Sequence, residues 1–340
     1  MTKQANLQEN IMNMRAIVEE YLQGSNMRAQ GPWQLYAKAS FIFSFLIITY
    51  FLALYFGSKS YISLLVLSSL YGFAMAIVQF NIMHDGSHRS FSNKEWINKI
   101  TSSIIMIAGA SPNLWRIKHV KLHHGAPGVF GTDTDIDQGP IFRFHKDSRS
   151  RWYHRYQHLY ALPLYCCLNL YWTPRDIYLA RKNKELRMDV FIAISLNIIF
   201  QIIIPLIFLQ NILKVIIFFL VYSFTLGVII SLVFVPAHTC NIVRMFSKSE
   251  CDNLDFMTQQ VMATADFNPQ SRLLNFITGG LNNQVTHHLF PWICHLHYPN
   301  IQPLVEKFCQ EHNIQYHKFP SFSQGILDHF RYIRMMGKSE

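Results

Sequence analysis

Residues 212–235 read ILKVIIFFLVYSFTLGVIISLVFV, and His238 follows after two further residues. Lys214 is the one charged residue in this stretch, whose length is close to the roughly 20 apolar residues that cross a hydrocarbon core. Polar groups at the end of a membrane span tend to be functional. The stretch therefore predicts an integral membrane protein with a functional site at the end of a span.

Three further apolar stretches, Ser40–Gly57, Tyr61–Phe80 and Val190–Gln210, have a similar length. The first two are joined by a very short connection, and the third is joined in the same way to residues 212–235, which predicts two transmembrane hairpins. These two connections carry only Lys59 and Lys214 of the 30 Lys and Arg residues. Because positive charge concentrates on the cytoplasmic side of a membrane, we expect the termini, the polar segments and every histidine to face the cytosol.

The predicted fold is an all-α, multi-pass membrane protein with four transmembrane helices in two hairpins and a helical cytosolic cap. We expect five segments, namely a cytosolic segment at 1–39, hairpins at 40–80 and 190–236, and cytosolic segments at 81–189 and 237–340. Met1–Gln34 is polar and lacks the apolar core of a cleavable signal peptide. Within it, Ile11–Leu22 has apolar residues at helical spacing, which indicates an interfacial helix or, alternatively, a helix packed against the cytosolic cap.

The composition separates this chain from soluble proteins and from nucleic-acid-binding proteins. Half of its residues are hydrophobic, its mean hydropathy is +0.13, and its net charge is +10. Basic residues such as Arg149, Arg151 and Arg155 are spread beside the spans, without a nucleic-acid recognition motif. We therefore expect contact with anionic lipid headgroups and no nucleic-acid partner.

The six cysteines form no CxxC pair and lie in segments that we expect in a reducing compartment, so disulfides are not predicted. The run CHLH at 294–297 has the residue types of a zinc site, but no second paired cluster accompanies it. We interpret this run as a packed turn.

Histidines form three clusters, HDGSH at 84–88, HVKLHH at 119–124 and QVTHHLFP at 284–291. Residues four apart share one face of a helix, so His84 and His88 can bind one metal ion or bracket two. The second cluster repeats this spacing, and the third combines spacings of three and four from its glutamine. Each cluster is predicted near the cytosolic end of a span, where a four-helix arrangement can bring all of them and His238 together.

Eight imidazoles exceed what one ion takes, which favours two metal ions. A structural zinc site would be closed by four ligands, frequently cysteines. Iron that activates dioxygen fits better, because an apolar substrate from the bilayer offers only C–H bonds. We expect the isolated histidines to be surface or hydrogen-bonded residues; these are His145, His154, His158, His312, His317 and His329.

In this order, and with the second pair of predicted spans between the second and third clusters, the three clusters resemble the histidine boxes of the membrane fatty acid desaturases, a superfamily that includes hydroxylases and related oxygenases. The resemblance runs from about Ile42 to Pro320. GGLNN at 279–283, Gln284 in place of the third box's first histidine, and Thr264–Asp266 are similar to the front-end, linoleoyl-CoA-desaturase-like branch. The HPGG motif of a fused cytochrome b5 domain does not occur in the sequence, so the resemblance implies a separate electron donor such as cytochrome b5 or ferredoxin.

The resemblance also implies roles for particular residues. The ligands of a non-haem di-iron centre would be His84, His88, His119, His123, His124, His238, His287 and His288. Asp85 would contact the ligands, and Gln284 would be either a ligand or such a contact. Acidic residues after the second box, Asp133, Asp135 and Asp137, would accept N–H bonds from ligands. Trp115 would line the acyl channel or, alternatively, act as an interfacial anchor.

The implied reaction uses O2 and two external electrons to introduce a double bond into a fatty acyl chain carried on CoA, a lipid or a carrier protein. A hydroxylase or acetylenase on the same scaffold is the nearest alternative. A non-enzymatic metal-binding protein or transporter would require more polar residues inside the spans, which hold few besides Asn197 and Gln201. A catalytically silent scaffold would tolerate loss of the histidines.

Overall fold

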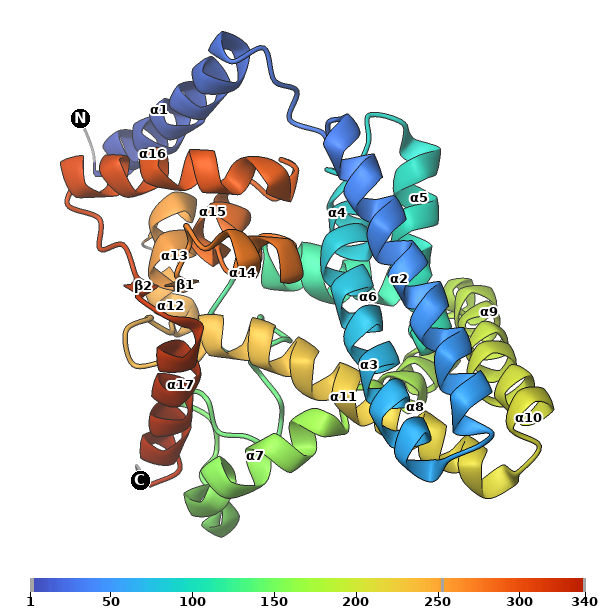
Figure 1. Ribbon diagram of the computed structural model, residues 1–340. Coiled ribbons are helices and arrows are strands. Elements are labelled where there is room, and N and C mark those ends of the chain that lie inside the picture. The colour runs from blue at the N-terminus through green and yellow to red at the C-terminus, as the bar shows by residue number, and fades with distance from the viewer. Residues whose placement is uncertain (1–2, 252–253, 339–340) are drawn as a thin grey trace.

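The computed structural model describes residues 3–251 and 254–338, and this part of the chain is mostly helical (Figure 1). Its strands are β1 (Asp266–Phe267) and β2 (Lys318–Phe319), which pair in parallel. Four helices are long and apolar enough to cross a membrane, and they extend over Trp33–Gly57, Tyr61–His88, Lys184–Leu209 and Ile212–His238. Each overlaps one predicted span, so the helical membrane fold is confirmed.

The first and fourth spans are single helices, and the second and third each contain a π-helical turn. The span helices are α2 (Trp33–Gly57), α3 (Tyr61–Val78) with α4 (His84–His88), α9 (Arg187–Ile198) with α10 (Ile204–Leu209), and α11 (Ile212–His238). The other helices are α1 (Lys3–Gly24), α5 (Glu95–Ser103), α6 (Pro112–Trp115), α7 (Gln157–Cys166), α8 (Leu168–Lys182), α12 (Lys248–Cys251), α13 (Phe256–Met262), α14 (Arg272–Ile277), α15 (Gln284–Leu289), α16 (Tyr298–Glu311) and α17 (Phe322–Met336).

Two spans continue beyond their predicted C-terminal ends, and both extensions carry histidines. The second span was expected to end at Phe80, but a π-helical turn at Gln79–Met83 leads directly into α4. The fourth was expected to end at Val235, but α11 continues through Pro236 to His238. The polar residues of these extensions are buried inside the protein, so the loss of apolar character does not end the helix.

The first and fourth spans pack closely on α3. Residues 58–60 join α2 to α3, and the two helices lie against each other, with α11 on another side of α3 (Figure 1). At Gly72 of α3, an added Cβ would lie 2.6 Å from the carbonyl oxygen of Tyr222 in α11. Only glycine permits this approach, so Gly72 fixes how closely two histidine-bearing spans pack.

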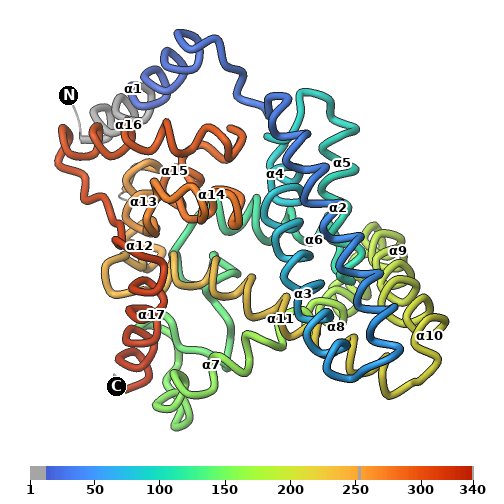
Figure 2. The backbone as a smooth tube through the Cα atoms, in the orientation of Figure 1, coloured from blue at the N-terminus to red at the C-terminus, as the bar shows by residue number. Residues whose placement is uncertain are grey.

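The N-terminal helix packs on the polar part of the protein. Met14, Val18 and Leu22 of α1 are buried in one apolar cluster with Ile301 and Val305 of α16. Figure 2 shows α1 beside α16, with α1 and α17 on the side away from the short connections between spans. For the described side chains, the packing alternative therefore holds, and contact of α1 with the membrane interface stays a prediction.

Candidate metal centre

The three histidine clusters and His238 meet at one end of the spans. His84 and His88 come from α4, which continues α3, and His119 and His123 from the π-helical segment Arg116–His123 that follows α6. The remaining histidines come from the end of that segment, from the last turn of α11 and from α15. All of the eight predicted ligands are buried; they are His84, His88, His119, His123, His124, His238, His287 and His288.

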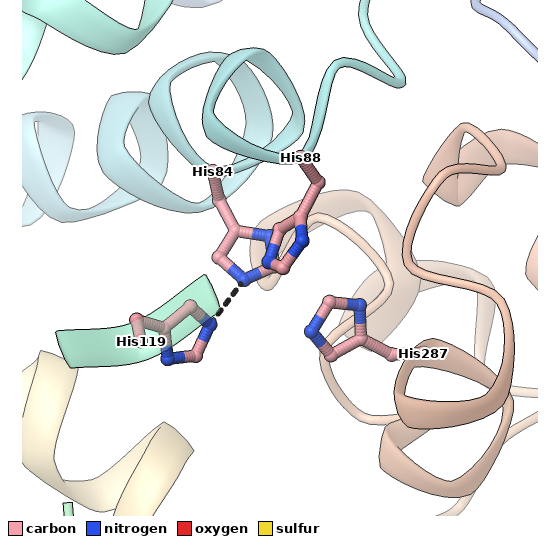
Figure 3. Close-up of side chains that lie close together, drawn as sticks. All are labelled: His84, His88, His119 and His287. Atoms are coloured by element: carbon pink, nitrogen blue, oxygen red, sulfur yellow. Dashed lines mark hydrogen bonds between the residues drawn. The ribbon is translucent and has the colours of Figure 1, made fainter. Parts of the chain in front are cut away.

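One group joins all three clusters. His84, His88, His119 and His287 each offer a ring nitrogen, and these four atoms lie within 4.8 Å of one another. Figure 3 shows the four rings converging from three segments of the chain. The Nε2 atoms of His84 and His119 are 3.1 Å apart, and the rings of His84 and His287 have centroids 4.6 Å apart. Residues separated by about two hundred positions thus share one small volume.

A second group lies directly beside the first. His123, His238 and His288 bring ring nitrogens within 4.8 Å of one another. His124 forms a third set with His287 of the first group and His288 of the second, so His124 connects the two groups. The structure therefore brings seven of the eight histidines into two adjoining sets, and His124 lies beside both.

Carboxylates hold two of the rings in place. His123 Nδ1 lies 3.0 Å from both oxygens of the buried Asp133, and His119 Nδ1 lies 3.2 Å from Asp135. Burial lowers the pKa of both imidazoles. For His119 burial outweighs the opposing effect of Asp135, so its pKa lies below the usual value. For His123, Asp133 and Asp135 prevail and raise the pKa. A carboxylate that accepts the Nδ1 proton leaves Nε2 as the atom that faces the other histidines.

Neutral groups hold three more rings by their Nδ1 atoms. His238 lies 3.2 Å from the carbonyl oxygen of Ala263, and His287 lies 3.1 Å from the Tyr298 hydroxyl. His288 Nδ1 lies 3.0 Å from Gln260 Oε1, and the amide nitrogen of the same glutamine donates to the carbonyl oxygen of His124 at 3.1 Å. Gln260 therefore links the second and third clusters.

The free nitrogen atoms of this site suit metal ions. Among the described residues, the Nε2 atoms of five predicted ligands are buried without a hydrogen-bond partner; these belong to His88, His124, His238, His287 and His288. Burial, reinforced by neighbouring imidazoles, holds the pKa of His124, His287 and His288 well below the usual value. Metals bind the neutral imidazole, and a buried lone pair without a partner is unfavourable. The residues present therefore fit a group of bound cations.

Asp85 makes its contact outside the three clusters. Its Oδ2 lies 2.8 Å from His295 Nδ1, and His295 Nε2 lies 2.9 Å from the amine of Lys38. Asp85, Cys294 and His295 offer atoms within 4.8 Å of one another. Since both ring nitrogens of His295 have partners, this arrangement is consistent with the packed turn expected at 294–297.

The remaining residues singled out in the sequence have different surroundings. Gln284 is buried at the start of α15, and its Nε2 has no hydrogen-bond partner among the described residues. Trp115 packs its ring 4.9 Å from that of His119 and 6.1 Å from that of Phe234 in α11. Because its side chain is only 8% exposed, Trp115 covers the cluster rather than pointing into the surroundings. Asp137 accepts a bond from Gly139 in a local turn.

Sequence reasoning missed Gln260 and Tyr298. Both are uncharged, and neither lies within a histidine cluster. Gln260 belongs to α13, whose pattern FMTQQVM contains adjacent glutamines of which one bonds to histidines and the other to the Pro127 carbonyl. Nothing in the pattern of the sequence marks the one that reaches the site.

Comparison with known proteins gives one family. A family model described as fatty acid desaturase matches residues 59–320. The chain is 28% identical to an sn-1 linoleoyl-lipid 6-desaturase of Arthrospira platensis, over 94% of this chain and 90% of that protein. It is 31% identical to an acyl-lipid (8-3)-desaturase of Physcomitrium patens, over 95% of this chain and 70% of that protein. A Delta(5) fatty acid desaturase A of Dictyostelium discoideum is 29% identical, over 94% of this chain and 73% of that protein.

Proposed function

The chain belongs to the fatty acid desaturase family and is a fatty acyl desaturase, and we propose that it acts on acyl chains of membrane lipids at a centre of two iron ions. Eight buried histidines converge, and the Nε2 atoms of five of them lack a hydrogen-bond partner among the described residues; this is the observation that carries the proposal. Three clusters far apart in the sequence would not place unsatisfied imidazoles together without a common ligand.

We propose that the two sets of histidines hold the two ions. His84, His88 and His119 would hold one, and His123, His238 and His288 the other. His287, which belongs to the first set, would complete the coordination of the first ion, and His124, which adjoins both sets, could complete that of either ion. Eight imidazole ligands suit a pair of iron ions better than one structural zinc ion, whose site is closed by four ligands.

When bound, iron would supply the oxidising chemistry that dioxygen and two electrons provide for breaking two C–H bonds. The protein supplies the geometry. Asp133 keeps the proton of His123 on Nδ1, Asp135 does the same for His119, and both thereby direct Nε2 toward the metal site. Trp115 and Phe234 cover the ring of His119 with apolar surface, which excludes water from that side.

The overall conversion takes one acyl chain, O2, two electrons and two protons to one alkene and two molecules of water. A separate donor such as cytochrome b5 or ferredoxin would supply the electrons. Two relatives whose names specify linoleoyl-lipid and acyl-lipid substrates support a lipid-linked acyl chain rather than a CoA thioester.

We also propose the orientation and division of the chain given by the positive charges. Segments 1–39, 81–189 and 237–340 would lie on the cytoplasmic side, with both termini and the metal centre. The distribution of Lys and Arg supports this orientation, since Lys59 and Lys214 alone lie at the connections within the two hairpins.

Product analysis tests the function. The protein, expressed in cells that lack acyl desaturation, should produce a new monounsaturated or polyunsaturated acyl chain in extracted lipids, detected by gas chromatography and mass spectrometry. His123→Ala should abolish the product, whereas the exposed His312→Ala should not. A hydroxylated or acetylenic product would identify the alternative reactions, and unchanged lipids with a metal-loaded protein and a competent donor would contradict the proposal.

A further inference from the structure

We propose that residues 156–174 form a re-entrant membrane element, which enters the bilayer from the side of the metal centre, reaches its middle near Asn169 and returns. The segment comprises α7 and the first half of α8. It lies outside the four predicted spans and within segment 81–189, of which residues 156–174 alone would leave the cytoplasmic side. Its contact with lipid does not depend on the reaction proposed above.

Composition gives the first argument. Between Arg155 and Arg175 the sequence contains no Lys, Arg, Asp or Glu, a run about as long as a membrane span. The run is divided between two helices that meet at Cys167, so neither helix alone is long enough to cross. An uncharged run of this length that turns back on itself is typical of a segment that enters the membrane without crossing it.

The second argument is the depth of Asn169 in the membrane, which can be estimated from its position relative to two different spans. The amide of Asn169 in α8 donates to Tyr222 Oη at 3.4 Å and to Ser223 Oγ at 3.1 Å, and Asn197 of α9 also reaches Tyr222 Oη, at 3.4 Å. At 1.5 Å per residue, Tyr222 lies about 15 Å from the start of α11 at Ile212. Asn197 lies about 18 Å from the end of the third span on the same side. In a hydrocarbon core about 30 Å thick, both distances correspond to the middle.

The return to the surface follows α8. Asp176 accepts a hydrogen bond from the backbone N–H of Ser111 at 2.8 Å, and the Ser111 hydroxyl donates to Asp189. Asp189 is about 30 Å from Leu209 along the third span, which corresponds to the opposite edge of the core. The first charges after the uncharged run, Arg175 and Asp176, therefore emerge where the third span also becomes charged.

The end of α7, on the side of the element that enters the membrane, packs on α11. The carbonyl oxygen of Cys166 lies so near Gly227 that an added Cβ there would be 2.5 Å from it, and Ser231 donates to the carbonyl oxygen of Tyr165 at 3.5 Å. Figure 1 shows that α7 approaches α11 and that α8 lies next to the span helices. Helical backbone on both sides of the corner and protein contact at the corner satisfy the condition for polar backbone at membrane depth.

Exposed side chains indicate what surrounds the element. Leu159 is 66% exposed, Leu162 44%, Leu164 39% and Tyr171 52%. Exposing four large apolar or aromatic side chains in a stretch without charges is unfavourable in water. Because α7 and α8 pack on α11 and α9, which also expose apolar side chains, lipid hydrocarbon is the occupant that this surface fits.

Thiol labelling tests the proposal in the full-length protein, reconstituted in lipid nanodiscs. A charged, water-soluble maleimide would be applied, and peptide mass spectrometry would read each site. Leu162→Cys is the informative variant, because its exposed position can be shielded by lipid but not by packing within the chain. Ser150→Cys provides an exposed reference just before the element, and Ser44→Cys an exposed reference within α2.

We expect Leu162→Cys to react at least tenfold more slowly than Ser150→Cys, at a rate similar to Ser44→Cys, and to react fully after denaturation in SDS. The native, half-buried Cys166 and Cys167 give the same readout in the unaltered protein if the variant does not fold. Reaction of Leu162→Cys as fast as Ser150→Cys would overturn the proposal.

A second measurement separates lipid from a protein cover. An apolar diazirine reagent dissolved in the bilayer should insert into the tryptic peptide between Arg155 and Arg175 as strongly as into peptides of α2. Slow maleimide labelling without such insertion would mean that a protein covers this surface, which would also overturn the proposal.

Discussion

Replacing Gln260 by leucine tests whether a residue outside the histidine clusters positions the metal ligands. Gln260 is fully buried; its Oε1 lies 3.0 Å from His288 Nδ1, and its Nε2 donates to the carbonyl oxygen of His124. Gln260→Leu keeps the approximate size of the side chain but removes both of its hydrogen bonds. Leaving two buried polar groups unsatisfied costs about 1–3 kcal/mol for each. Loss of a residue that orients a ligand lowers metal affinity about 10–100-fold.

The assay measures the affinity of the detergent-purified protein for iron by competition with a chelator, alongside its thermal unfolding. Gln259→Leu is the matched control, because the neighbouring buried amide donates to the Pro127 carbonyl and to no histidine. We expect both variants to lose stability and only Gln260→Leu to lose metal affinity by tenfold or more. Equal metal affinity in Gln260→Leu and wild type, in well-folded protein, would refute the positioning role.

Asp133→Asn should lower metal affinity about tenfold or more, because the buried Asp133 holds His123, whereas Asp137→Asn, in an exposed turn, should not; chelator competition checks both. In the metal-free protein, the free energy of unfolding should fall as pH drops below 6.5, since burial keeps the pKa of imidazoles such as that of His287 low and the unfolded chain then binds more protons; denaturation at several pH values measures this. Burial raises the pKa of Asp266 to about 7, so its carboxyl group stabilises the fold most at low pH, and this contribution is lost as pH rises from about 4 to 7. Asp266→Asn should therefore gain stability relative to wild type over that range, and a pH-independent difference would contradict this reasoning.

The spans and the histidine clusters could be predicted because each follows a local rule. Apolar runs of membrane length locate all four spans, and spacings of three and four place paired histidines on one helical face. The ends of two spans could not be located in the same way. HDGSH at 84–88 is too polar to resemble a span, but it continues the helix because the protein buries it.

Contacts between distant segments were beyond local rules. Asp133 and Asp135 were predicted because acidic residues follow the second cluster closely, and each lies beside a histidine in the structure. Asp85 was expected to orient ligands by its position in the first cluster, but the partner that the fold gives it is His295. The role of Gln260 depends on how α13 packs against α15, which no spacing in the sequence encodes.

Metal content tests the central claim most directly. Mass spectrometry of the metals in detergent-purified protein from iron-supplemented cells would compare wild type with His123→Ala and His287→Ala, one variant for each set of histidines, and with His312→Ala as a control outside the site. We expect close to two metal ions per chain in wild type and in His312→Ala, and a sharp loss in the other two variants. Stoichiometric metal in both of those variants, or none in a well-folded wild type, would contradict it.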